Sequence, residues 1–336
     1  MKKRLLLGSA VLAMAAAPGF KVTDHIKIGG TGTFWDYMYV DAGAARLYMS
    51  HLNQTEVIDL KTNKVIGTVT ETPRVHGIAV AGDLGKGYTS NGGNNTVSVF
   101  DLKTFKTTAT IPTGTNPDAI IYEPSTHRVL AFNGNSKDAT IIDAKTEKVV
   151  ATVPVGGKPE FAQTDGKGRV WVNIEDTAEV IEVDAAKATI TRRLKMEPCE
   201  DPTGLSIDTK IDTKKGRLFA ACKGLMAAVD IKSWKVLGTA PTGAGSDGIV
   251  YDDGRAFTSN GGDGTMTVLG EQGGKWVVEE TVPTMRGART IGVDSKTHKI
   301  YLPVAENGPA PVGKDGKAKG RGPVLGETFQ LLVVSK

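Results

Sequence analysis

Alternating apolar and polar positions recur along this chain in blocks of about a dozen residues. Five segments show the pattern most clearly: VIDLKTNKVIGTV (57–69), VFDLKTFKTTATI (99–111), IIDAKTEKVVATV (141–153), EVDAAKATITRRL (182–194) and AVDIKSWKVLGTA (228–240). In each, an alternating run ends at an aspartate, a short polar turn follows, and a second β-rich run returns. The pattern therefore predicts five β-hairpins. Their turn aspartates, separated by 42, 42, 41 and 46 residues, are Asp59, Asp101, Asp143, Asp184 and Asp230.

The hairpins belong to a longer repeat. The phrase TSNGGNNTVSVFD (89–101) returns as TSNGGDGTMTVLG (258–270), 169 residues later and hence four repeats further on. A period of about 40 to 45 residues with four short strands in each repeat is typical of propeller blades. The sequence therefore predicts an all-β fold, a single β-propeller with about 42 residues per blade.

The number of blades follows from the expected starts of their first strands. These starts, separated by 40, 42, 42, 43, 44 and 42 residues, are Asp36, His76, Asp118, Glu160, Thr203, Asp247 and Arg289. Seven blades are predicted. The last blade has a Pro/Gly-rich insertion at 307–326 and lacks a fourth strand at the C-terminus, so we expect the strand-like segment 20–30 to complete it and close the ring.

Two of these stretches carry a family resemblance. The phrasing TSNGGNNTVSVFDLKT and the first hairpin NPDAIIYEPSTHRVLAF resemble the YVTN-type β-propeller repeat family. The resemblance covers essentially the whole chain after its first residues. It implies an exported bacterial or archaeal protein, and it brings no shared catalytic motif that could be carried over to this sequence.

The first residues, MKKRLLLGSAVLAMAAA, combine three basic residues with an apolar run that is too short to span a bilayer. They predict a signal peptide at 1–15, a single propeller domain at 16–336, and a periplasmic or secreted monomer without a membrane span. Loss of Lys2, Lys3 and Arg4 lowers the formal net charge from +4 to +1. Such a charge gives little electrostatic drive toward nucleic acid, so we expect no specific nucleic-acid partner.

Two cysteines, Cys199 and Cys222, lie on either side of the expected first two strands of the fifth blade. An exported protein matures in a compartment that permits disulfides. We therefore predict a structural disulfide between them rather than a catalytic thiol.

Polar side chains at the starts of the first strands should converge on one end of the propeller axis, which we call the top. Clusters of ionisable groups on rigid strand ends are typical of binding sites. Upper loops add two more candidates to this set. The predicted ligand-binding residues are Asp36, His51, His76, Asp118, Glu160, Asp247, Arg289 and Glu306. The alternative is that this end is merely hydrated surface.

A metal site is one interpretation of this cluster. Imidazole and carboxylate groups suit divalent metals, and the candidate ligands are His51, His76, Asp36 and Asp118, although no local spacing is diagnostic. No catalytic motif of the G-x-S-x-G type is present. The leading hypothesis is an exported binding or scaffold protein that recognises a small molecule or protein partner at the top face. A metal-dependent hydrolase of the lactonase type is the alternative, and quinone-cofactor redox chemistry is a third, from fold analogy alone.

Overall fold

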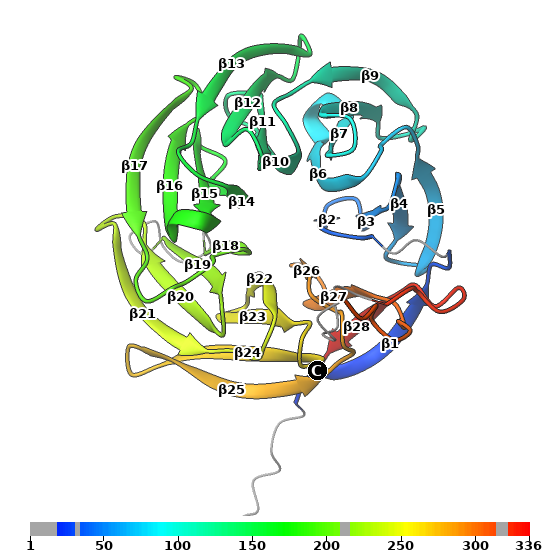
Figure 1. Ribbon diagram of the computed structural model, residues 1–336, viewed down its shortest axis with the longest axis vertical. Helices are drawn as coiled ribbons and strands as arrows, with labels where there is room; N and C mark the ends of the chain where they lie inside the picture. The colour runs from blue at the N-terminus through cyan, green and yellow to red at the C-terminus, as the bar shows by residue number, and fades with distance from the viewer. Residues whose placement is uncertain (1–18, 31–33, 209–215, 314–321) are drawn as a thin grey trace, which may run out of the picture.

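Seven four-stranded antiparallel sheets form a ring of blades around a central axis in the computed structural model, which describes residues 19–30, 34–208, 216–313 and 322–336 (Figure 1). The predicted all-β, seven-bladed architecture is confirmed. In each blade the first strand lies beside the axis and the fourth lies at the rim (Figure 1). None of the helices among the described residues is long and apolar enough to span a bilayer.

The first four blades are continuous in sequence. Blade 1 consists of β2 (Met38–Asp41), β3 (Arg46–His51), β4 (Gln54–Asp59) and β5 (Lys64–Val69). Blade 2 consists of β6 (Val75–Ala81), β7 (Lys86–Asn91), β8 (Thr96–Asp101) and β9 (Thr107–Pro112). Blade 3 consists of β10 (Pro117–Glu123), β11 (Arg128–Asn133), β12 (Asp138–Asp143) and β13 (Lys148–Pro154). Blade 4 consists of β14 (Pro159–Thr164), β15 (Arg169–Ile174), β16 (Glu179–Asp184) and β17 (Thr189–Lys195).

The remaining blades complete the circle, and two short 3-10 turns, η1 (Gly82–Leu84) and η2 (Glu175–Thr177), lie in connections. Blade 5 consists of β18 (Leu205–Asp208), β19 (Arg217–Cys222), β20 (Leu225–Asp230) and β21 (Lys235–Pro241). Blade 6 consists of β22 (Ser246–Asp252), β23 (Arg255–Asn260), β24 (Thr265–Gln272) and β25 (Lys275–Pro283). Blade 7 consists of β26 (Gly292–Asp294), β27 (Lys299–Val304), β28 (Gln330–Ser335) and, from the other end of the chain, β1 (Lys21–Lys27).

The ring closes through β1, which pairs antiparallel with β28 from Lys21 opposite Ser335 to Lys27 opposite Gln330. The predicted closure of the last blade by an N-terminal strand is therefore confirmed. In Figure 1 the strand runs along the outer edge of blade 7, with the C-terminus beside it. The predicted signal peptide and part of the 307–326 insertion lie outside the described residues.

The core consists of layers between neighbouring blades. Alternate residues of β11 face opposite ways: Leu130 and Phe132 pack with the apolar residues of blade 4, whereas Val129 and Ala131 pack toward blade 2. All four are fully buried. Both faces of the sheet are therefore covered, which explains why the middle strands of each blade are almost continuously apolar.

The repeated aspartates have the structural role expected of turn residues. Asp59, Asp101 and Asp143 each accept hydrogen bonds from the backbone N–H groups two and three residues further on. Blade 6 has Gly270 at this place, and its outer hairpin continues for two more pairs to Gln272 opposite Lys275. These aspartates lie at the end of the ring opposite to the top, which we call the bottom.

Cys199 and Cys222 form a disulfide with a Cα–Cα distance of 5.4 Å, and both are buried. The bond connects the segment before β18 to the last residue of β19. It lies within an apolar cluster that also contains Met196 and Leu205.

The closing strand generates the first prediction. Ile26 is 3% exposed and packs with Trp35 and Phe329, whereas Ile66, on the rim strand of blade 1, is 42% exposed. Ile26→Ala should lower the free energy of unfolding by about 2 to 5 kcal/mol, and the matched control Ile66→Ala by less than about 1 kcal/mol. Urea unfolding measures both. Equal losses would contradict a closing role for β1.

The disulfide generates the second prediction. Without reductant, the intact mass should be lower than that of the reduced protein by two hydrogen atoms, and neither cysteine should react with an alkylating reagent. Replacing both Cys199 and Cys222 by serine should cost about 3 kcal/mol of stability, because the unfolded chain loses a closed loop. Alkylation of both cysteines in the native, unreduced protein would refute the bond.

Candidate functional site

Residues at the top ends of the innermost strands surround the axis and form what we call the mouth ring. Its members, one from each blade, are Asp36, His76, Asp118, Glu160, Thr203, Asp247 and Arg289. In blades 2, 3, 4 and 6 the ring residue occupies a β-bulge, where the pairing register shifts near the start of β6, β10, β14 and β22. A bulge redirects a side chain locally. In blades 1, 5 and 7 the regular strand begins two or three residues after the ring position, later than the sequence predicted.

Serine side chains tie the ring to the second strand of the preceding blade. Ser90 Oγ accepts a hydrogen bond from Gly77 N at 2.9 Å and donates to the backbone oxygen of Asp118 in the next blade. Ser259, in the second copy of the TSNGG phrase, donates to the backbone oxygen of Arg289. Both copies of the phrase thus supply a serine that holds the ring residue of the following blade in place.

His76 lies between the carboxyl groups of the two neighbouring ring residues. Its Nδ1 lies 2.7 Å from Asp36 Oδ2 and 3.4 Å from Asp118 Oδ1. The three side chains come from three neighbouring blades, and all are buried, with 5 to 7% of each residue exposed. The ring of Phe34 packs edge-on against the imidazole with 5.0 Å between centroids. These three side chains are therefore largely shielded from solvent.

Arg289 closes the ring between the last blade and the first. Its Nη2 donates to Asp36 Oδ1 at 3.0 Å and to the Trp35 carbonyl at 2.9 Å, while Nη1 donates to Asp247. Burial alone would lower the pKa of Arg289, but Asp36 and Asp247 raise it above its usual value. The guanidinium is thus a permanent cation, shared between two carboxylates.

A second group of charges surrounds Glu160. The Tyr37 hydroxyl donates to Glu160 Oε2 at 3.0 Å, Lys158 Nζ lies 2.6 Å from Glu160 Oε1, and Lys158 also pairs with Glu175. Neither Tyr37 nor Lys158 was predicted, although each lies within two residues of a ring position. Thr203 completes this side by donating from its hydroxyl to the Asp247 carbonyl at 2.9 Å.

The carboxyl groups of the ring differ in acidity. Burial raises the pKa of Asp118 well above its usual value, and the charges of Asp36 and Glu160 add to the rise. Burial also raises the pKa of Glu160, to about 7, against the opposing effect of Lys158. Burial acts on Asp36 in the same direction, but Arg289 and His76 outweigh it and lower its pKa.

Burial is the main cause of the two raised pKa values, and neighbouring negative charges add to it. If Arg289 is assigned to Asp247 and Lys158 to Glu160, two carboxyl groups remain, those of Asp36 and Asp118, with an imidazole between them. Groups of like charge in a buried site raise each other's cost of ionisation. The mouth ring is therefore suited to a positively charged ligand.

One ligand atom each from Asp36, His76 and Asp118 lies within 4.8 Å of the other two. The structure thus brings together three of the four residues predicted as metal ligands. His51, the fourth, lies on the same face but turns away: its Nδ1 contacts Glu56 Oε1 at 3.1 Å and its ring packs on Phe329.

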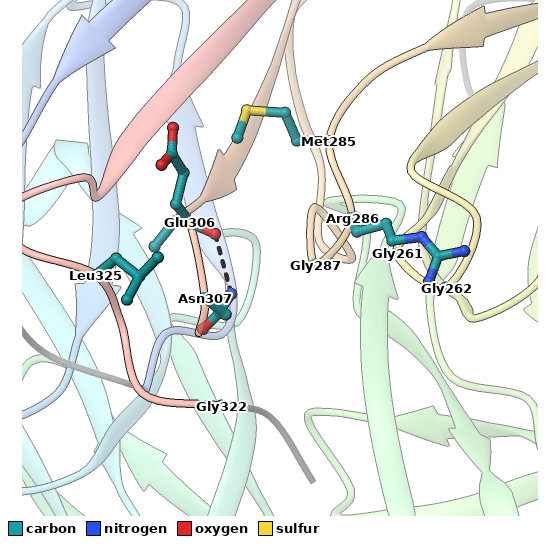
Figure 2. A pocket seen from close by; sticks show the side chains of 10 residues that line it. Gly261, Gly262, Met285, Arg286, Gly287, Glu306, Asn307, Gly322 and Leu325 are labelled. Atoms are coloured by element: carbon teal, nitrogen blue, oxygen red, sulfur yellow. Dashed lines mark hydrogen bonds between the residues drawn. The ribbon is translucent and has the colours of Figure 1, made fainter. Parts of the chain in front are cut away.

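Glu306 also stands apart from the ring. It is exposed and lines a shallow depression of about 690 Å³ between the upper loops of blades 6 and 7. Figure 2 shows Glu306 and Leu325 on one side of this depression and Arg286 on the other. Gly261, Gly262 and Gly287 also line it. The predicted ligand-binding set therefore divides into six residues of the mouth ring and two residues outside it.

An apolar cavity of about 260 Å³ extends along the innermost strands of blades 1 to 4, next to the ring. Its walls include Ile78, Ala119, Ile120 and Phe161. Tyr37, whose hydroxyl donates to the ring residue Glu160, also lines the cavity. Sequence reasoning missed this cavity because it arises from the spacing of four separate strands. The charged ring thus adjoins an apolar space that could hold an organic part of a ligand.

Comparisons with solved structures support the fold alone. The structure of U3-55K matches with a TM-score of 0.72 at 7% sequence identity, covering 92% of this chain and 97% of that chain. The RRP9 WD40 repeats match with a TM-score of 0.72 at 7% identity, covering 92% and 96%. Hydrazine synthase of Kuenenia stuttgartiensis matches with a TM-score of 0.68 at 14% identity, covering 88% and 96%.

Sequence comparisons give one family. No curated protein matches this chain. The family described as a domain of unknown function, DUF5074, matches residues 43–224, which run from the first blade into the fifth. The match covers more than half of the 336 residues, and the chain therefore belongs to the DUF5074 family.

Proposed function

We propose that this protein is an exported binding protein that takes a cationic ligand at its mouth ring. One observation carries the proposal: the four carboxyl groups of the mouth ring, those of Asp36, Asp118, Glu160 and Asp247, share only two fixed cations among the described residues, Arg289 and Lys158. Buried carboxylates are costly unless they are paired, and such unbalanced groups are typical of functional sites. A cationic ligand would supply the missing charge.

The rigidity of the ring supports a role in binding. The Ser50, Ser90 and Ser259 side chains hold the backbone of ring residues or their neighbours, so the carboxylates are positioned before any ligand arrives. A pre-organised site loses less conformational entropy on binding. The repeats, which we assign to the YVTN type, provide this scaffold from all seven blades.

Export to the periplasm or the exterior is supported by two features. The basic and apolar residues at 1–15 have the pattern of a signal peptide, and the Cys199–Cys222 disulfide is of the kind that persists in oxidising compartments. A protein partner that inserts a lysine or arginine side chain into the ring would use the same charges as a small cation.

A metal-dependent hydrolase of the lactonase type is the second candidate function. The grouping of Asp36, His76 and Asp118 favours it, because a hydrolytic metal centre needs a few protein ligands and an open coordination position. Turnover of a lactone panel that is lost in Asp118→Asn would favour the enzyme over the binding protein.

The third prediction tests the binding proposal. The thermal midpoint is measured with cations and with anions added as ligands. The cations are divalent metals, ethylammonium and methylguanidinium, and the anions are acetate and phosphate. At least one cation should raise the thermal midpoint of the wild type, because a ligand that binds only the native state stabilises it. This rise should be absent in Asp118→Asn.

Asp252→Asn is the matched control for that experiment, since Asp252 pairs with His298 at the bottom of the ring. It should retain the wild-type response to the same cation. Stabilisation by anions alone, or an undiminished response in Asp118→Asn, would refute binding of a cation at the mouth.

The fourth prediction concerns pH. The pKa of Glu160 is about 7 in the native state, against an ordinary value of 4.5. Between these two pH values Glu160 keeps its proton in the native state, whereas the unfolded chain has released it. Its contribution therefore lowers the free energy of unfolding as pH rises from about 5 to about 7. Lys158, Tyr37, Glu175 and Asp247 face this carboxyl group. We expect Glu160→Gln to reduce the loss of stability between pH 5 and pH 8.

Urea unfolding at the two pH values measures this change, and Asp143→Asn is the control. Hydrogen bonds from the Thr146 backbone, aided by Arg128, lower the pKa of Asp143 to about 2, so its titration lies below the chosen window. The control should keep the wild-type dependence on pH. The same dependence in Glu160→Gln would contradict a raised pKa at Glu160.

A further inference from the structure

We infer that the mouth ring binds one divalent transition-metal ion between Asp36, His76 and Asp118. The inference rests on the proposed function, because it names the cation that the ring takes. The three ligand atoms lie within 4.8 Å of one another. Around a single ion they would lie about 3 to 4 Å apart, since each metal–ligand bond is about 2.1 Å long. Only small shifts of the three side chains are therefore needed for them to coordinate one ion.

Within the described part of the chain, Asp118 lacks a hydrogen bond at the oxygen that an ion beside His76 Nδ1 would contact. A proton on His76 Nδ1 can be directed at one oxygen, and Asp36 Oδ2, at 2.7 Å, is nearer than Asp118 Oδ1, at 3.4 Å. Asp118 Oδ1 is buried and accepts no hydrogen bond from any described residue. An ion bound to the lone pair of a neutral imidazole would contact both carboxylates at once.

The surrounding charges favour a cation. Four ring carboxyl groups share two cations among the described residues: Arg289 pairs with Asp36 and Asp247, and Lys158 pairs with Glu160 and with Glu175 outside the ring, so Asp118 has only the imidazole of His76 beside it. Arg289 Nη2 also donates to Asp36 Oδ1, so the other oxygen of Asp36 faces the imidazole. Arg289 is therefore a positioning residue of the kind that orients metal-binding carboxylates.

The donor atoms indicate which metals fit. One imidazole nitrogen with two carboxylates suits Zn²⁺, Mn²⁺ or Fe²⁺, whereas Ca²⁺ and Mg²⁺ prefer oxygen ligands alone. Three protein ligands leave at least one position for water or a second ligand. Zn²⁺ and Co²⁺ are the appropriate probes, since Co²⁺ reports its ligands through visible absorption.

His51 provides a matched control within the same face. Like His76 it is buried, with 6% exposed against 5%, and its Nδ1 also lies beside a carboxylate. It differs in having Glu56 as its single ion-pair partner among the described residues. Loss of His51 should therefore leave metal binding intact, although the two histidines were equal candidates in the sequence.

The fifth prediction is tested on the full-length folded protein after treatment with a chelator and desalting. Zn²⁺ alone is titrated, and bound metal is measured by mass spectrometry after removal of free ions. The wild type should hold about one equivalent. Asp118→Asn keeps the shape of the side chain. Because substitutions of residues outside the coordination shell weaken metal binding by up to about 100-fold, loss of this direct ligand should weaken Zn²⁺ binding by more than that.

His76→Ala should likewise abolish binding and the Co²⁺ spectrum, whereas His51→Ala and bottom-face His298→Ala should retain both. Circular dichroism verifies folding, and Asp118→Asn decides the result if His76→Ala is unfolded. The inference is overturned if the wild type binds no Zn²⁺, or if Asp118→Asn binds it as well as the wild type does. The proposed function survives such a failure if organic cations still bind the wild type but not Asp118→Asn.

Discussion

Both faces of every sheet in this fold are apolar, so no blade can be stable without a neighbour on each side. Strand β11 shows the constraint directly, since Phe132 packs toward blade 4 and Val129 toward blade 2. A row of blades under this rule must become a circle. The circle closes only when β1 pairs with β28 from the far end of the chain, and that pairing brings the top ends of all seven innermost strands to one axis.

The mouth ring depends on the same closure. Arg289 in blade 7 contacts Asp36 in blade 1, and this ion pair exists only in the closed circle. Asp36 in turn faces His76, so the order of contacts follows the order of blades. The energy from apolar packing between blades offsets the cost of holding these charges out of water. The fold can therefore tolerate a site with surplus carboxylates, because its stability comes from the apolar packing between blades.

The sequence predicted the architecture well because the signals for a propeller are local and repeated. Turn aspartates, alternating strands and a constant spacing are visible in single hairpins, and each copy reinforces the others. The site was harder to predict. Aligning strand starts found His76 and Asp118, but the bulges that direct these side chains depend on pairing between strands. Individual side-chain contacts decide the remainder: His51 turns to Glu56, five residues away, and Tyr37 binds Glu160 from another blade.

The serine hydrogen bonds between blades hold the backbone of the ring and do not involve the side chains that it presents. Ser90 and Ser259 bind backbone atoms of Asp118 and Arg289, and backbone atoms are the same for every amino acid. A substitution at position 118 or 289 therefore changes the chemistry of the mouth without removing the bond that holds its backbone. At these two positions the frame and the chemistry of the mouth can vary independently of each other.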